Sequence, residues 1–112
     1  MEITTAQKDN ALLVTITGTI DAMAIETLSA TLSEQIRQGK TRMVADFGQV
    51  DYINSAGLRA LLVALKDTQR KGGDFRLAGV QENVKRALEL AGFTSLFKIF
   101  PDAEAGVASY SS

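Results

Sequence analysis

The chain contains neither cysteine nor histidine, and these two absences exclude several kinds of chemistry. Without cysteine there are no disulfides, thiol nucleophiles or thiolate metal ligands. Without histidine there are no imidazole ligands and no Ser-His-Asp relay. Histidine is also the most frequent general acid–base group, so an enzyme built on this chain would depend on carboxylates, lysines or tyrosines. The absence of cysteine fits a cytoplasmic protein, and we expect that location.

The chain also lacks an excess of one charge sign and lacks long apolar runs. Its net charge is −1 with both signs interspersed, which argues against direct nucleic-acid binding. No apolar run approaches the roughly 20 residues that span a bilayer, and residues 1–5 show no signal-peptide pattern. We therefore expect no membrane segment. With 112 residues, of which 46% are apolar, we expect one globular domain spanning residues 1–112.

Strand and helix patterns alternate along the sequence. Leu12, Val14 and Ile16 share one face of an apolar strand, and Asp9-Asn10 before them reads as the turn of a hairpin. The order β-β-α-β-α-β-α-β-α predicts an α/β fold with a mixed, mainly parallel sheet of four to five strands and about four helices. The first strand should lie at an edge. Strands are expected at residues 2–8, 11–17, 43–47, 74–78 and 97–100, and helices after residue 21, from residue 55, around residues 84–91 and from residue 102.

Helix ends carry recognisable signals. Asp21 is a natural N-cap for the first helix, because its carboxylate can accept free N–H groups of the first turn. Gly39 is a plausible stop for that helix, and Gly72-Gly73 for the second. The second helix has an apolar stripe with polar residues opposite, although Val63 lies among the polar ones. The stripe consists of Leu58, Leu61, Leu62 and Leu65.

Two patterns invite a nucleotide-binding or enzyme interpretation, and neither is supported by its surroundings in the sequence. Gly39-Lys40-Thr41 looks like the end of a phosphate-binding loop, but the motif requires glycine where Glu34 stands, and it should follow a strand. The carboxylates of Asp21, Asp46 and Asp51 could form a catalytic pair or a metal site. However, Asp46 stands alone, and the other two suit a cap and a turn. We expect no enzyme, no cofactor and no metal.

Ser55 is the residue that these eliminations leave. It stands where an apolar strand gives way to an amphipathic helix, over backbone N–H groups that have no partner within a helix. Asn54 or Ser55 could merely cap that helix. Two features favour a functional serine: both cap-type residues are present where one suffices, and Gly57 carries a helix cost of about 0.5–1 kcal/mol. Small side chains at Ala56 and Gly57 would leave the serine accessible to another protein.

The stretch Asn54-Ser55-Ala56-Gly57-Leu58 resembles the Asp-Ser-(Ser/Thr/Ala)-Gly-Leu motif of the STAS domain, specifically of the bacterial anti-sigma factor antagonists. Agreement extends along the whole chain. The similar segments are Gly18-Thr19-Ile20-Asp21, Val44-Ala45-Asp46-Phe47, Val50-Asp51-Tyr52-Ile53, Gly72-Gly73, Ala91-Gly92-Phe93 and Phe97-Lys98-Ile99.

The resemblance implies a phosphorylation switch. In that family the unphosphorylated antagonist binds an anti-sigma factor that is itself a serine kinase, and binding releases a sigma factor. The kinase ends the interaction by phosphorylating the motif serine, and a PPM-type serine phosphatase restores it. The implied phosphoacceptor is Ser55. We expect the partner-binding surface, on a monomer or weak dimer, to comprise Asp21, Asn54, Ser55, Ala56, Gly57 and Arg59.

Asn54 departs from the family pattern, which usually has aspartate before the serine. Asparagine keeps the capping ability but loses the charge. If that charge orients the serine or the kinase metal, phosphorylation would be slow or absent, and the protein would be a constitutive antagonist. STAS domains also serve as fixed modules in stress-sensing or transporter complexes. A scaffold or regulatory subunit without a sigma-related role is therefore the alternative.

Overall fold

A β-hairpin begins the fold in the computed structural model, which describes residues 1–111. Strands β1 (Glu2–Lys8) and β2 (Ala11–Ile20) pair antiparallel across the Asp9-Asn10 turn. Asp9 has a positive φ of 50°, a conformation that aspartate tolerates in tight turns. The apolar residues of β2 that were predicted to share one face are all buried in the main core: Leu12, Val14 and Ile16.

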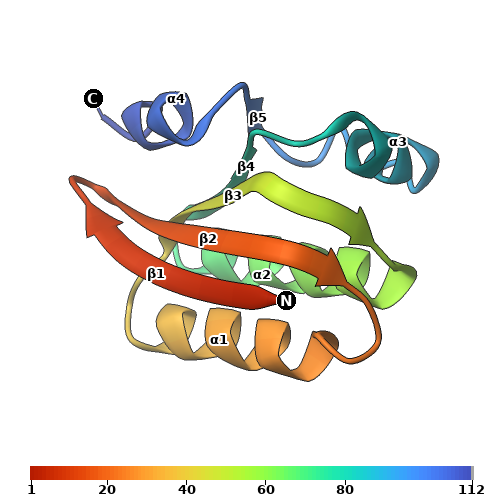
Figure 1. Ribbon diagram of the computed structural model, residues 1–112. Coiled ribbons are helices and arrows are strands. Elements are labelled where there is room, and N and C mark those ends of the chain that lie inside the picture. The colour runs from red at the N-terminus through yellow and green to blue at the C-terminus, as the bar shows by residue number, and fades with distance from the viewer. Residues whose placement is uncertain (112) are drawn as a thin grey trace.

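The rest of the sheet is parallel. From β2 onward each strand pairs parallel with its neighbour, and the spatial order is β1-β2-β3-β4-β5 (Figure 1). The predicted mixed, mainly parallel sheet with the first strand at an edge is confirmed. The three remaining strands are β3 (Arg42–Ile53), β4 (Asp74–Ala78) and β5 (Ile99–Phe100).

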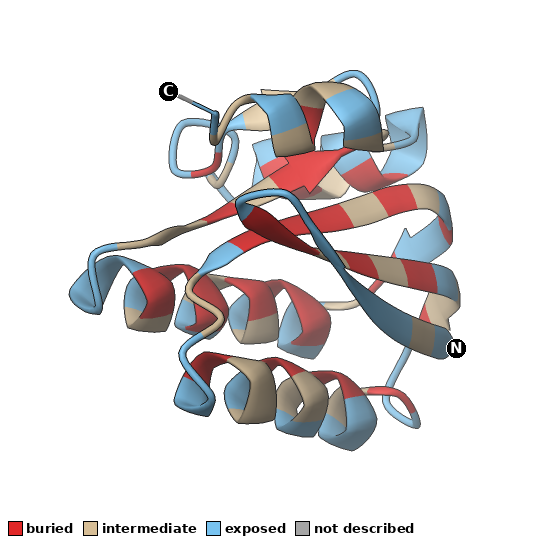
Figure 2. Ribbon diagram, turned by 90° about the vertical axis from the view of Figure 1, so that its left-hand side faces the viewer, coloured by how far each residue is buried: buried red, intermediate tan, exposed pale blue. Residues whose placement is uncertain are grey.

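Four helices cover the sheet, as the alternating pattern predicted. They are α1 (Ile25–Arg37), α2 (Ser55–Arg70), α3 (Glu82–Leu90) and α4 (Ala103–Ala108). Helices α1 and α2 lie side by side on one face, and α4 lies on the other (Figure 1). Their buried sides face the sheet, whereas β1 is largely exposed (Figure 2). The main core lies under α1 and α2 and also includes Val84 and Leu88 of α3.

Strand β3 is longer than the sequence suggested. The expected strand at residues 43–47 continues to Ile53. The pairing between β2 and β3 shifts register within this stretch, and the strand goes on beyond the shift. Thr15 lies opposite Asp46 while Thr17 lies opposite Gln49, so β3 has one extra residue in that interval. The Asp46 carboxylate supports the irregular backbone by accepting the Gly48 N–H at 2.9 Å. At the other end of the sheet, β5 is shorter than expected and excludes Phe97, which packs edge-on against Phe75.

Both glycine-containing connections have structural explanations. Gly39 has a φ of 90° and its N–H bonds the Ile36 carbonyl at 3.0 Å, so it terminates α1 and forms no phosphate-binding loop. Gly73 lies so close to the start of β3 that a Cβ atom would sit 1.9 Å from the Thr41 carbonyl oxygen. Only glycine permits this approach.

Candidate functional site

The ends of β2 and β3 bring two loops together at one edge of the sheet. Ile20 lies opposite Ile53 in the parallel register, and the Asn54 N–H bonds the Ile20 carbonyl at 3.0 Å. Asp21 follows Ile20 directly, and Ser55 follows Asn54. Asp21 and Ser55, which are 34 positions apart in the sequence, therefore occupy neighbouring loops.

Asn54 is the N-cap of α2. Its side-chain oxygen Oδ1 accepts the Gly57 N–H at 2.8 Å, and its backbone carbonyl accepts the Leu58 N–H at 3.0 Å. This settles which of the two cap-type residues performs the capping. The Ser55 side chain is exposed, and its hydroxyl makes no hydrogen bond to any other part of residues 1–111. The serine is thus free of a structural hydrogen-bonding role.

Gly57 is buried beneath the site, whereas Ala56 is exposed beside the serine. A Cβ atom on Gly57 would lie 2.7 Å from Ile20 Cγ2 and 2.7 Å from Ile53 Cγ1. The structure therefore gives Gly57 a different role from the one that we inferred. Its missing side chain lets the first turn of α2 lie directly on the ends of β2 and β3.

The prediction that Asp21 caps α1 is wrong. Helix α1 begins at Ile25, its N-cap position is Ala24, and no side chain caps it. Asp21 instead stabilises the turn that precedes the helix, because its Oδ1 accepts the Met23 N–H at 3.1 Å and its carbonyl accepts the Ala24 N–H at 3.0 Å. The Asp21 residue remains exposed.

Two large exposed side chains border this site, and sequence reasoning did not select them. Met23 is 89% exposed, two residues after Asp21, and Tyr52 is 50% exposed, three residues before Ser55. Both side chains lie close in sequence to residues of the site and add exposed apolar area there. The signal in the sequence is weak, since each lies in a short stretch without clear periodicity.

Asp51 and Asp46 have structural contacts instead of forming a metal site. The Asp51 carboxylate accepts a hydrogen bond from the Thr19 hydroxyl at 2.8 Å, and its backbone carbonyl accepts one from the Asn83 amide. These contacts connect the end of β3 to β2 and α3. Within residues 1–111 no group of three or more acidic side chains is placed to hold a metal ion.

Arg59 lies one helical turn after Ser55 and is exposed. It forms no ion pair within the described part of the chain. The three carboxylate–cation pairs there involve Arg37, Arg70 and Arg76. None of the helices in residues 1–111 has the length and apolar character needed to cross a membrane.

Comparison with known proteins agrees with this architecture. Residues 2–106 match the family model described as the STAS domain. BtrV of Bordetella bronchiseptica, whose name assigns it to the anti-sigma factor antagonists, is 33% identical over 110 residues, covering 98% of this chain and 95% of the relative. The anti-sigma-B factor antagonist of Bacillus subtilis is 27% identical over 101 residues, covering 90% of this chain and 92% of the relative.

Solved structures share the fold at lower identity. The anti-sigma factor antagonist SpoIIAA in its unphosphorylated form has a TM-score of 0.84 at 17% identity, covering 96% of this chain and 95% of that one. The same protein, from Bacillus, in its phosphorylated form has a TM-score of 0.77 at 16% identity, covering 96% and 98%. The family model and the relative at 33% identity decide the assignment: the chain belongs to the STAS-domain anti-sigma factor antagonists, a family of non-enzymatic regulators.

Proposed function

We propose that this protein binds an anti-sigma factor serine kinase through the surface around Ser55, releases a sigma factor, and is switched off when Ser55 is phosphorylated. The observation that carries the proposal is the division of roles between two adjacent residues. Asn54 provides the helix cap, and the Ser55 hydroxyl is exposed and has no hydrogen-bond partner within residues 1–111. A hydroxyl in that state can enter a kinase active site without loss of a structural contact.

Phosphorylation should act on the interface and leave the fold intact. A phosphate adds about −1.5 to −2 charges at pH 7. Ser55 is the first residue of α2, where the helix dipole favours negative charge by roughly 0.3–1 kcal/mol. The partner, in contrast, would have to desolvate that charge on binding. Asp21 in the neighbouring loop adds a second negative charge to the same surface.

The partners follow from this switch. The kinase is the anti-sigma factor itself, and a PPM-type serine phosphatase reverses the modification. The contact surface comprises Asp21, Asn54, Ser55, Ala56 and Arg59, with Gly57 supporting it from below. We place the protein in the cytoplasm, acting without direct contact to nucleic acid, as a monomer or weak dimer. The relatives that support the proposal are named as antagonists of anti-sigma factors.

The test compares Ser55→Ala and Ser55→Asp for binding to the anti-sigma factor encoded in the same genome, by isothermal titration calorimetry. Ser55→Ala should bind like the unmodified protein, and Ser55→Asp at least about tenfold more weakly, since a carboxylate carries only part of the phosphate charge. Incubation with the kinase and ATP, followed by mass spectrometry, should place the phosphate on Ser55. Equal, undiminished binding by both variants would refute the proposed regulation by phosphorylation of Ser55.

The alternative, a scaffold or regulatory subunit in a stress-sensing or transporter complex, predicts a different outcome. Such a subunit would show no binding to an anti-sigma factor and no exchange of a sigma factor. Co-purification from the native host distinguishes the two, because the antagonist should recover a kinase and the scaffold a membrane or sensory assembly.

A further inference from the structure

A groove of about 240 Å³ runs between α1 and α2, and its lining on α2 begins at Ala56, the residue after Ser55. Both helices run in the same direction, as crossovers between parallel strands require, so their N-termini lie at the same end. The groove is hollow because small side chains line much of it: Ser29, Ser33, Ala56 and Ala60.

The walls of the groove are mainly apolar. Val63 lines it and is 49% exposed, which explains the valine that stood among polar residues in the sequence pattern of α2. Ile25 of α1 also lines the groove and is only partly buried. Apolar side chains kept accessible in a groove of a water-exposed helix pair can bury further area against another molecule.

Charge distinguishes the two ends of the groove. At the Ser55 end, Arg59 forms no ion pair within residues 1–111, and the first turn of α2 holds no acidic residue. At the far end, the Asp67 carboxylate is paired with Arg70 at 3.0 Å. Of the two charged residues that line the groove, Arg59 at the Ser55 end is therefore the one without an ion pair in residues 1–111, although Asp21 carries a negative charge in the loop beside Ser55. This favours an occupant whose negative group sits at the Ser55 end.

We propose that the groove receives an apolar segment of the anti-sigma factor, with a carboxylate that pairs with Arg59. The inference rests on the proposed function, because it extends the interface around Ser55. Continuity supports it: Ala56 and Arg59 line the groove and flank the serine in the same turn of helix. A partner that covers Ser55 thus reaches the groove without a gap.

Phosphorylation would act on the same arginine. Ser55 and Arg59 are four residues apart on one helix face, and helical side chains lean toward the N-terminus, so the Arg59 guanidinium can reach a group on Ser55. A phosphate on Ser55 captures the guanidinium and removes it from the partner carboxylate. Modification thereby weakens binding in two ways, by adding charge and by withdrawing the arginine.

The first experiment measures binding of groove variants to the anti-sigma factor by calorimetry. Val63→Glu places a charge against the apolar segment and should weaken affinity by about tenfold or more, and Arg59→Gln should weaken it by about tenfold. The matched controls are Leu90→Glu on α3, where leucine is 83% exposed, and Lys66→Gln on α2. Both controls should bind like the unmodified protein.

The second experiment needs no partner. Protein with phosphoserine encoded at position 55 is titrated and followed by ³¹P NMR. The second phosphate pKa should rise by roughly 0.3 units in Arg59→Gln, because loss of an i,i+4 cation disfavours the dianion. Lys66→Gln should leave that pKa unchanged. Circular dichroism confirms that every variant is folded.

The outcomes separate the two proposals. If Val63→Glu and Arg59→Gln bind the anti-sigma factor as tightly as the unmodified protein does, the proposed role of the groove is refuted and the proposal for Ser55 stands. An unchanged phosphate pKa in Arg59→Gln overturns the competition for the arginine. If Ser55→Asp binds as tightly as the unmodified protein, the switch fails, while the effect of Val63→Glu in the same titrations still reports on the groove.

Discussion

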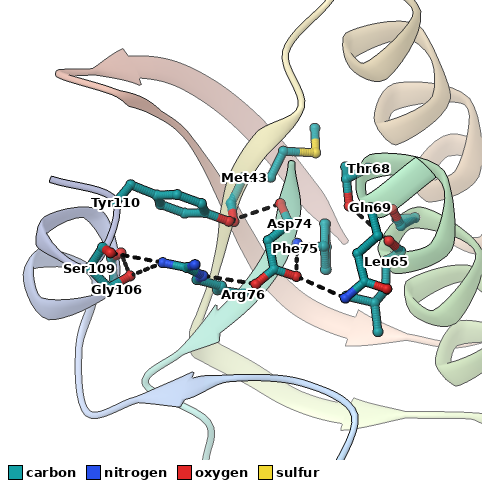
Figure 3. Close-up of polar contacts among 11 residues, drawn as sticks. Met43, Leu65, Thr68, Gln69, Asp74, Phe75, Arg76, Gly106, Ser109 and Tyr110 are labelled. Atoms are coloured by element: carbon teal, nitrogen blue, oxygen red, sulfur yellow. Dashed lines mark hydrogen bonds and ion pairs between the residues drawn. The ribbon is translucent and has the colours of Figure 1, made fainter. Parts of the chain in front are cut away.

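The guanidinium of Arg76 lies over the ring of Tyr110, 3.8 Å from its centroid. Arg76 belongs to β4, and Tyr110 follows α4, so the contact holds the C-terminal segment against the sheet (Figure 3). Arg76 also pairs with Asp74 at 3.0 Å and donates to the Ser109 carbonyl at 3.0 Å. The Tyr110 hydroxyl lies 2.8 Å from the Met43 carbonyl and 2.9 Å from that of Asp74. Helix α4, which is only six residues long, is thus held by contacts beyond its own end in addition to its packing on β3 and β4.

Tyr110→Phe should lower the free energy of unfolding by about 1 kcal/mol near neutral pH, because two backbone carbonyls lose a shared donor. Urea denaturation measures this loss. Tyr52→Phe is the control, since Tyr52 is half exposed and should change stability little. Equal effects of the two substitutions would contradict the assigned role of the Tyr110 hydroxyl.

The stability supplied by Tyr110 should depend on alkaline pH. Burial raises the pKa of Tyr110 above its ordinary value of about 10. The folded protein then holds its proton where the unfolded chain has lost it, so this contribution is complete below about pH 10 and falls as the pH rises further. The stability difference between the unmodified protein and Tyr110→Phe should shrink above that pH. A difference that grows instead would reverse the sign and refute the prediction.

Asn54→Ala and Ser55→Ala should differ in stability although they are neighbours. Removing the Asn54 cap leaves the Gly57 N–H without its acceptor and should cost about 1 kcal/mol. Ser55→Ala removes an exposed hydroxyl that makes no hydrogen bond in the described part of the chain, and should stay within about 0.5 kcal/mol of the unmodified protein. Thermal and urea unfolding of both variants provide the measurement. A large loss in Ser55→Ala would show that the serine contributes to the cap after all.

Gly57→Ala should destabilise the protein, against the usual preference of helices for alanine. At an open helical position this change gains about 1 kcal/mol. At position 57, however, the new Cβ atom would meet Ile20 and Ile53 at 2.7 Å, and such overpacking typically costs about 1–3 kcal/mol. The sign of the change in unfolding free energy therefore decides between the two effects. A gain in stability would mean that Ile20 and Ile53 move aside at little energetic cost and would contradict this prediction.

Asn54→Asp should accelerate phosphorylation of Ser55. Aspartate retains the Oδ acceptor for the Gly57 N–H, so the helix cap should persist. It also restores the charge that the family usually carries before the serine. Initial rates of phosphate incorporation with the kinase and ATP compare the two proteins. Identical rates would show that the charge is dispensable and that the asparagine does not slow this switch.

The order of elements and the place of the serine were predictable from the sequence, because both depend on local patterns. Leu12, Val14 and Ile16 show a two-residue period that predicts a half-buried strand, and Leu58, Leu61 and Leu65 show a helical one. The N-cap chemistry of residues 54 and 55 marks the helix start. The full length of β3 was not predictable, because its continuation beyond Phe47 depends on irregular pairing with β2.

Tertiary structure alone decided the features that join distant residues. The hydrogen bond from the Asn54 N–H to the Ile20 carbonyl places Asp21 in the loop beside Ser55. Asp21 stabilises a turn there instead of capping α1. Gly57 owes its identity to two isoleucines, one of them 37 positions earlier in the chain. The groove between α1 and α2 exists only after both helices have packed on the sheet. Sequence patterns report on neighbours along the chain, whereas these features arise from residues that folding brings together.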